Sequence, residues 1–269
     1  MKKGFKESMI METEKQSMAQ RHRHILELLR RTGEMRVVDI CNEVDVSQVT
    51  VRKDIKLLER KKLLFRLHGS VSLLNPYLTR DVSVSEKELI KVEEKVRIAR
   101  HAATLINDTD AIIIASGTTV LSLARQLEAK QQLTVLTSAL NVATVLCQNP
   151  AIEVIQLGGI VRKTSTSVNG PFIQQMLSQF SCSKLFLGVD GIDLEYGCTT
   201  SNLMEANANQ YMIAAVQRTI ILTDSSKFGK RGFGRICSFD KVHQIITDDK
   251  VSESVVVALE DMGVEVTVV

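Results

Sequence analysis

The stretch Ser47-Gln48-Val49-Thr50-Val51-Arg52-Lys53-Asp54-Ile55-Lys56-Leu57-Leu58-Glu59 decides how the first part of this chain folds. Val51, Ile55 and Leu58 recur at i, i+4 and i+7, which predicts a helix with one buried stripe. Ser47 is suited to cap that helix, because its side-chain oxygen can accept a hydrogen bond from an amide of the first turn. The cationic residues of the stretch fall on another face, which must meet solvent or a polyanion.

A second short helix is expected just before this one. Its apolar residues also recur at helical spacing, and they are Val37, Ile40, Cys41 and Val44. Only Asp45-Val46 separates the two helices, and two short amphipathic helices joined this tightly predict a helix-turn-helix. The second helix of such a pair enters the DNA major groove with its first turns against the bases. We therefore expect base contacts from Gln48, Val49, Thr50 and Arg52, and mainly phosphate contacts from Lys53, Lys56, Arg66 and His68, with Ser47 at the start of the helix.

The flanking residues extend this motif to a winged helix. Upstream, a third helix is expected from about Arg21 to Arg31 and ends at Gly33. Downstream, residues 63–71 alternate apolar and polar side chains around a glycine, as in a small β-hairpin. A small helical domain whose basic face is merely solvated is the alternative.

The overall charge of +3 conceals an asymmetry that opposes this alternative. Residues 1–70 carry 16 Lys and Arg against 10 Asp and Glu, whereas the remaining residues carry 18 against 21. A basic head on a mildly acidic body fits a chain that binds a phosphate backbone at one end only. We therefore expect double-stranded DNA as a partner of the first part.

The composition, 44% apolar and 24% charged with no Trp, is ordinary for a soluble protein. No run approaches the roughly 20 apolar residues that cross a bilayer, and the polar N-terminus lacks the apolar core of a signal peptide. We expect a cytoplasmic protein with no membrane partner. The cysteines are odd in number and unpaired in spacing, which indicates reduced thiols rather than disulfides. Because the His residues are scattered too, we expect neither a metal site nor a cofactor.

The pattern divides the chain into four segments. Residues 1–19 are polar and are expected to form a disordered extension, and residues 20–74 form the winged helix-turn-helix. Residues 75–94, which begin with Asn75-Pro76 and are largely polar, are the expected linker. From Lys95 a new helix starts an α/β domain that runs over 95–269.

This second domain shows strict alternation of buried strands and helices, which predicts a largely parallel sheet. The expected helices lie near 118–129, 140–147, 171–180, 203–216 and 252–261. The expected strands are Ala111–Ala115, Leu133–Thr137, Ile152–Leu157, Lys184–Val189, Thr219–Thr223, His243–Thr247 and Val264–Val269.

The loops after these strands are rich in glycine and polar side chains. Ser116-Gly117-Thr118-Thr119 runs directly into a helix, where hydroxyls and free amides suit a phosphate; a simple helix cap is the plainer alternative. Asn141, in the next loop, could merely order a turn. Gly158-Gly159 allows close backbone approach and is followed by Arg162, although a glycine turn beside solvated charges has the same pattern.

Two further loops add carboxylates and a cation. Asp190-Gly191 ends an apolar strand, Glu205 follows shortly after, and Lys227 lies beyond another strand. Each loop alone is ambiguous. Because ligands bind beyond the carboxyl ends of parallel strands, the loops together predict a polar pocket that suits a phosphorylated polyol.

From about residue 20 to its end, the chain resembles the DeoR family of bacterial sugar-responsive transcription regulators. The resemblance rests in the first part on Ser47-x-x-Thr50-x-Arg52-x-Asp54 and Arg66-x-His68-Gly69. In the second part it rests on Ser116-Gly117-Thr118-Thr119, Gly158-Gly159, Asp190-Gly191-Ile192-Asp193, Gly197-x-Thr199-Thr200 and Asp224-Ser225-Ser226-Lys227. It implies a winged-helix reader joined to a sensor domain similar to sugar-phosphate isomerases, a phosphorylated sugar as effector, and a homo-oligomer, dimer or tetramer.

The chain departs from the family pattern at three places. Ala115 stands where the family commonly has an acid, which bears on effector choice. Gly69-Ser70 replaces a Gly-Gly pair in the wing, and Lys61-Lys62 replaces a glycine after the recognition helix.

These observations predict a regulator, expected to be a repressor, of a carbohydrate catabolic operon whose DNA affinity a phosphorylated sugar modulates. The rival class is an enzyme, a sugar-phosphate isomerase with Asp190 or Glu205 as its base. A third class is an adaptor that binds protein through the winged helix, which the cationic face disfavours.

Overall fold

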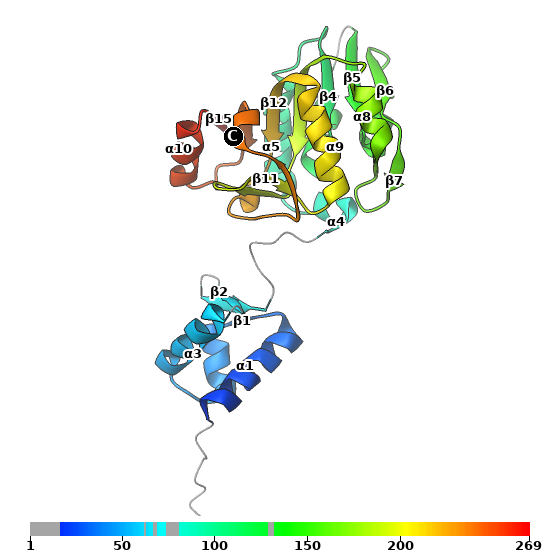
Figure 1. The fold of residues 1–269 in the computed structure, drawn as a ribbon. Coiled ribbons are helices and arrows are strands. Elements are labelled where there is room, and N and C mark those ends of the chain that lie inside the picture. The colour runs from blue at the N-terminus through cyan, green and yellow to red at the C-terminus, as the bar shows by residue number, and fades with distance from the viewer. Residues whose placement is uncertain (1–16, 62, 67–68, 74–80, 129–131) are drawn as a thin grey trace, which may run out of the picture. The chain divides into compact units, whose positions relative to one another are not determined.

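The computed structural model describes residues 17–61, 63–66, 69–73, 81–128 and 132–269 (Figure 1). The chain divides into two compact units, Met1–Pro76 and Tyr77–Val269.

The first unit is the expected winged helix-turn-helix. Its three-stranded sheet has the order β1-β3-β2 and is antiparallel. The unit consists of α1 (Met18–Thr32), β1 (Glu34–Arg36), α2 (Val37–Val44), α3 (Gln48–Arg60), β2 (Phe65–Arg66) and β3 (Ser70–Ser72). The hairpin of β2 and β3 confirms the predicted wing, whereas β1 was not predicted because three residues, only the middle one apolar, give no clear period.

The apolar stripe of α3 forms the centre of this unit's core. Val51, Ile55 and Leu58 are at most 1% exposed, and they pack with apolar residues of the other two helices and of the sheet. The predicted spacing therefore identified the buried face correctly. Burial of three such side chains stabilises the unit by roughly 1.5–3 kcal/mol each.

The expected extension over 1–19 is too long at its end. Ser17 caps α1 and forms a reciprocal capping box with Gln20, so residues 17–19 belong to the DNA-binding unit. Residues 1–16 lie outside the described residues, as does the expected domain end at residue 74.

The second unit is built on a seven-stranded sheet with the order β15-β14-β12-β9-β4-β5-β6. Every neighbouring pair in it is parallel, as predicted. Its strands are β4 (Ala111–Ile114), β5 (Leu133–Thr137), β6 (Ile152–Gln156), β9 (Cys182–Gly188), β12 (Val216–Leu222), β14 (Gln244–Thr247) and β15 (Glu265–Val268). All seven coincide with predicted strands to within a few residues at each end.

Helices cover both faces of this sheet (Figure 1). Within β4, Ile113 packs toward one face and Ile112 and Ile114 toward the other, as the two-residue period of a strand requires. One face is covered by α8 (Pro171–Leu177), α9 (Leu203–Ala214) and α10 (Glu253–Asp261), and the other by α5 (Val92–Ala103), α6 (Thr118–Gln126) and α7 (Leu140–Leu146).

Two small antiparallel additions were not predicted. β7 (Ile160–Arg162) pairs with β8 (Ser167–Asn169), and a three-stranded sheet has the order β10-β11-β13. The latter consists of β10 (Gly191–Asp193), β11 (Gly197–Thr200) and β13 (Gly234–Cys237). These strands are only three or four residues long, which is too short for a readable alternation.

The segment 75–94 is not the simple linker that we expected. Residues Val84–Glu88 form the short helix α4, and α5 already begins at Val92. The amide of Val84 donates to the carbonyl of Thr164 at 2.8 Å, and the Val84 side chain is buried. The polar composition misled the prediction, because this segment packs through hydrogen bonds and ion pairs rather than through an apolar stripe.

The order of strands creates a topological switch at the middle of the sheet. From β4 the chain proceeds to β5 and β6 on one side, and from β9 it proceeds to β12, β14 and β15 on the other. Loops that leave neighbouring strands in opposite directions open a crevice at their carboxyl ends. The loops after β4 and β9 therefore bound the place where a ligand is expected.

Candidate functional site

The recognition helix α3 presents a polar, cationic face to solvent. Thr50 donates its amide to the Ser47 Oγ at 3.4 Å, which confirms the predicted cap. Val49 is 65% exposed although it is apolar, so its side chain is free for contact with a partner. The other exposed residues of this face are Gln48, Arg52, Lys53 and Lys56, and Thr50 is half-buried.

A groove lies between the start of α3 and the wing. Gln48 and Arg52 line it from α3, Arg66 lines it from β2, and Gly69 and Ser70 line it from the turn into β3. The structure thus brings two of the expected base-reading residues together with one expected phosphate-contacting residue. His68 lies outside the described residues.

A buried carboxylate ties α3 to α1. Asp54 Oδ2 accepts a hydrogen bond from Arg21 Nε at 2.5 Å, and Asp54 Oδ1 lies 3.1 Å from His22 Nε2. The Asp54 side chain is only 3% exposed, and its hydrogen bond raises the pKa of Arg21. This pair positions the recognition helix, a role that spacing alone did not predict.

The pocket of the second unit lies at the topological switch. Its lining combines hydroxyls, lysines and carboxylates from six segments of the chain. The expected lining residues that do line it are Ser116, Gly117, Thr118, Thr119, Asp190, Glu205 and Lys227.

The loop between β4 and α6 presents hydrogen-bond donors to this pocket. Gly117 caps α6 with φ 132°, a conformation that favours glycine, and no side chain among the described residues caps the helix. The first amides of α6 and the hydroxyls of Ser116, Thr118 and Thr119 are therefore available to a ligand. An uncapped helix start carries partial positive charge and suits an anion.

Asp190, at the end of β9, is a carboxylate whose side chain is 12% exposed and which has a hydrogen-bond partner on each oxygen. Its Oδ1 accepts from Lys87 Nζ at 2.6 Å, and its Oδ2 accepts from the Ser201 amide at 2.9 Å. Burial favours a higher pKa, but the charge and hydrogen bond of Lys87 outweigh it, so the pKa of Asp190 lies below its ordinary value. This carboxylate is negatively charged near neutral pH.

Thr200 joins Asp190 to the second carboxylate of the pocket. Its Oγ1 lies 3.2 Å from Asp190 Oδ2 and 3.2 Å from Glu205 Oε2. Because one hydroxyl has one proton, one of the two carboxylates always has spare capacity to accept from a ligand hydroxyl. Sugar hydroxyls are the donors that such an arrangement can bind.

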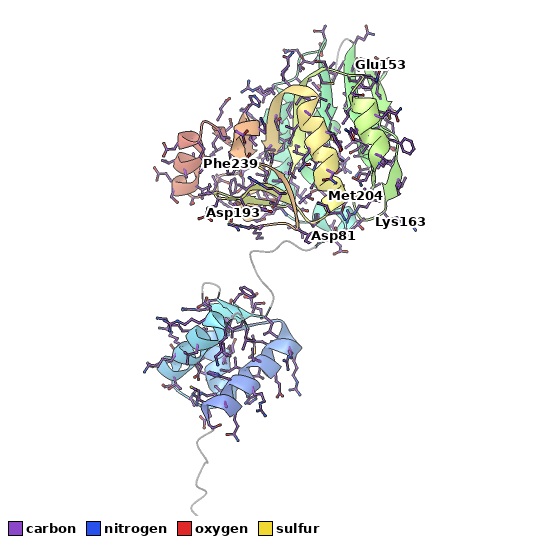
Figure 2. The ribbon with its side chains drawn as sticks, viewed as in Figure 1. Asp81, Glu153, Lys163, Asp193, Met204 and Phe239 are labelled. Carbon is purple, nitrogen blue, oxygen red and sulfur yellow. The ribbon has the colours of Figure 1, made fainter. Side chains whose placement is uncertain are left out.

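Arg162 supports Glu205 from behind. Its Nη1 donates to Glu205 Oε1 at 2.9 Å, and its Nη2 donates to Asp81. Figure 2 labels Asp81, and also Met204, which precedes Glu205 in the first turn of α9. Arg162 is not among the residues that line the pocket, and its guanidinium pairs with Glu205 and Asp81, so a ligand contact from Arg162 stays a prediction.

Two lysines remain to balance an anion. Lys227 lines the pocket from the turn after β12, and it has no ion-pair partner among the residues that the structure describes. Lys95 is 6% exposed, and its Nζ donates to the carbonyls of Lys87 and Ile90. Burial lowers the pKa of Lys95. Neither Lys95 nor Lys87 was predicted for this site.

Four further residues that we expected in the site lie elsewhere. Asn141 accepts from the amide of Val142 at 3.0 Å, which is the turn-ordering role that the sequence left open. The amide of Gly158 donates to the sulfur of Met176. At Gly159 and Gly191 a Cβ atom would come within 2.5 Å of a backbone oxygen, so these glycines permit close packing of chain segments instead of approach to a ligand.

The lining residues that we missed come partly from loops at strand ends and partly from segments with no strand-end signal. Asn209 and Glu205 lie at i and i+4 on α9, and both are buried although they are polar. That spacing of two polar residues amid alanines was the one available signal. The other missed residues are Val84, Lys87, Ile90, Lys95, Ser165, Gly188, Val189, Thr200, Thr223, Asp224 and Ser226.

No group of three or more His, Cys, Asp or Glu side chains in the described ranges could bind a metal ion. No described helix is long and apolar enough to span a bilayer.

Known proteins resemble the chain over most of its length. The DeoR-like helix-turn-helix domain matches residues 21–76, and the DeoR C terminal sensor domain matches residues 90–249. The lactose phosphotransferase system repressor of Staphylococcus epidermidis is 32% identical over 227 residues, which cover 84% of this chain and 90% of that protein. The transcriptional repressor GlcR of Bacillus subtilis is 31% identical over 245 residues, covering 91% and 93%.

Among solved structures, ribose 5-phosphate isomerase A of Methanocaldococcus jannaschii is similar at a TM-score of 0.38 with 15% identity, covering 50% of this chain and 53% of that one. The family matches cover both units and the curated relatives are transcriptional repressors. The chain therefore belongs to the DeoR family of DNA-binding transcriptional regulators and is not an enzyme.

Proposed function

We propose that this regulator represses a carbohydrate catabolic operon and that a phosphorylated sugar, bound where β4 and β9 end, modulates its affinity for the operator. The observation that carries the proposal is the uncapped start of α6, which lines the pocket together with three neighbouring hydroxyls. Lys227 lines the same pocket. The phosphate would lie against these amides and Lys227, because a helix start and a cation both favour an anion.

The sugar would lie toward the carboxylates. Asp190 and Glu205 share the single hydroxyl proton of Thr200, which leaves acceptor capacity for sugar hydroxyls. Asn209 offers both donors and an acceptor from the neighbouring turn of α9. A phosphate alone would leave this half of the pocket unused.

On the DNA side, we propose that Gln48, Val49, Thr50 and Arg52 contact base edges, and that Lys53, Lys56, Arg66 and His68 contact phosphates. The supporting observation is the exposed face of α3 beside a groove that the wing completes. We also propose a dimer or tetramer, since paired heads match the paired half-sites of an operator. Sedimentation of the full chain measures that state.

The residues that would serve an isomerase do not have the required properties. A general base works best with a pKa near the working pH, whereas the pKa of Asp190 is lowered by its pairing with Lys87. Glu205 is ion-paired with Arg162 and lies within hydrogen-bond distance of Thr200, which suits a hydrogen-bond acceptor. The geometry therefore favours binding of a sugar phosphate over its conversion.

Calorimetry of the full chain with a panel of pentose and hexose phosphates tests the proposal. We expect at least one to bind and to change retardation of a promoter fragment from beside its own gene. Lys227→Met should weaken binding by roughly 10–100-fold, since a charge-assisted hydrogen bond contributes about 1.5–3 kcal/mol. Lys241→Met is the matched control, because Lys241 is 63% exposed and is not one of the lining residues. Absence of heat with every sugar phosphate would refute the effector class.

A further inference from the structure

The segment that follows the DNA-binding unit forms a wall of the effector pocket. Asp81 comes only five positions after Pro76, the last residue of the first unit. Among the residues that follow Asp81, Val84, Lys87 and Ile90 line the pocket. The chain that leads from the DNA-binding unit is therefore part of the site where we place the effector.

One ion pair connects α4 to the carboxylate of the pocket. Lys87 Nζ donates to Asp190 Oδ1 at 2.6 Å, and the two side chains are 23% and 12% exposed. Asp190 is one of the two acceptors that we assign to the sugar hydroxyls. A ligand hydroxyl that donates to Asp190 must share or replace the Lys87 ammonium.

The other contacts of the segment do not involve Asp190. The carbonyls of Lys87 and Ile90 accept from Lys95, and Glu88 pairs with Arg125 of α6 at 2.6 Å. Asp81 pairs with Arg162 and accepts from Ser201 Oγ at 3.4 Å. Of the ion pairs of α4 that the described residues show, Lys87–Asp190 alone lies in the pocket lining.

We propose that the Lys87–Asp190 pair is a latch that fixes α4, and that the effector opens it by competing with Lys87 for Asp190. This inference rests on the proposed effector site. The two states then differ in effector affinity, which is the requirement for a ligand to shift a conformational equilibrium. Released from Asp190, α4, which follows the chain segment that leads from the DNA-binding unit, loses its ion pair with the pocket.

Competition predicts the direction in which effector affinity changes when Lys87 is removed, and this direction distinguishes a latch from a simple ligand contact. If Lys87 only contacted the phosphate, its removal would weaken effector binding. If it competes with the effector, its removal leaves Asp190 without its cation, and binding becomes equal or tighter. The effector then has no latch left to open, so operator affinity no longer responds to it.

The test compares full-length wild type, Lys87→Met and Glu88→Gln, first without any added ligand. Hydrogen exchange of the amides of residues 84–90 and affinity for the promoter fragment are measured for each. Exchange reports the free energy of local opening, so we expect roughly threefold or faster exchange and a changed operator affinity in Lys87→Met. Glu88→Gln removes the ion pair between α4 and Arg125 of α6, and this variant should match wild type in the operator assay. Asp190→Asn should reproduce Lys87→Met.

Equal exchange and operator affinity in Lys87→Met and wild type would overturn the latch. Equal effects of Lys87→Met and Glu88→Gln would overturn it too, because α4 would then be weakened irrespective of Asp190. A second arm titrates glucose 6-phosphate and inorganic phosphate, and weaker binding of either to Lys87→Met would make Lys87 a ligand contact instead. If no sugar phosphate binds wild type, the proposed effector class fails, while the ligand-free comparison still decides whether the pair restrains α4.

Discussion

The role of Asp54 in holding the recognition helix can be tested by comparing two substitutions in the same unit. Each substitution removes one ion pair, but one of the pairs is buried and the other is exposed. Asp54→Ala removes the acceptor of Arg21 and His22, and the Asp54 side chain is 3% exposed. Asp39→Ala removes the acceptor of Arg36, and that pair is 76% and 40% exposed. Both substitutions remove one negative charge, so they change the attraction to DNA equally.

The expected loss follows from the burial of the partners. Removing one member of a buried pair typically costs 3–5 kcal/mol, but Arg21 lies at the edge, 12% exposed, and can regain water. We therefore expect Asp54→Ala to lower the free energy of unfolding by about 2–3 kcal/mol. A unit of roughly 60 residues has only about 3–9 kcal/mol of stability in total. Its melting temperature should fall by roughly 10–20 °C, whereas Asp39→Ala should leave it nearly unchanged.

The assay combines thermal unfolding of the full chain with operator binding at two temperatures. The unit that unfolds first should be the DNA-binding unit in Asp54→Ala, with the transition of the sensor unit unmoved. At low temperature, where this unit is still folded, operator affinity should approach that of Asp39→Ala, and at 37 °C it should be lost. Equal melting of the two variants would refute the role of Asp54 in holding α3 to α1.

Further outcomes are expected at other sites. Arg52→Ala should reduce discrimination among operator sequences by about 1–3 kcal/mol, measured by competition with single-base variants; unchanged discrimination would remove Arg52 from the base-reading set. Lys56→Ala should weaken all sequences alike and reduce the slope of log affinity against log salt by about 0.9. Hydrogen bonds from Lys250 and Lys91 lower the pKa of Glu94 to about 2. A carboxyl group with a lowered pKa stabilises the fold at pH values above its ordinary pKa, and this stabilisation is lost as the pH falls toward 2. Glu94→Gln should therefore flatten the acid limb of the plot of unfolding free energy against pH. Identical acid limbs in the variant and in wild type would contradict this expectation.

The residues of the pocket show where sequence patterns stop being informative. The Ser116–Thr119 loop and Lys227 were predictable, because each directly follows an apolar strand and all parallel strands end at one edge. Lys87 was not predictable, because nothing in a polar segment of five helical residues indicates which carboxylate it will meet 103 positions later. Arg162 was predicted for a ligand contact, whereas the structure pairs it with two carboxylates.

The sequence by itself determined the two-domain plan, the buried stripe of α3 and the seven parallel strands, because hydrophobic period is a local property and burial follows it. It also determined the chemical types present near the strand ends. Only the tertiary structure decided which of those side chains face the cavity and which form ion pairs. It also decided that α4 belongs to the pocket. The physical reason is that a charged side chain in a partly buried site takes whichever opposite charge the fold brings within a few ångströms, and that distance depends on strand order and not on spacing along the chain.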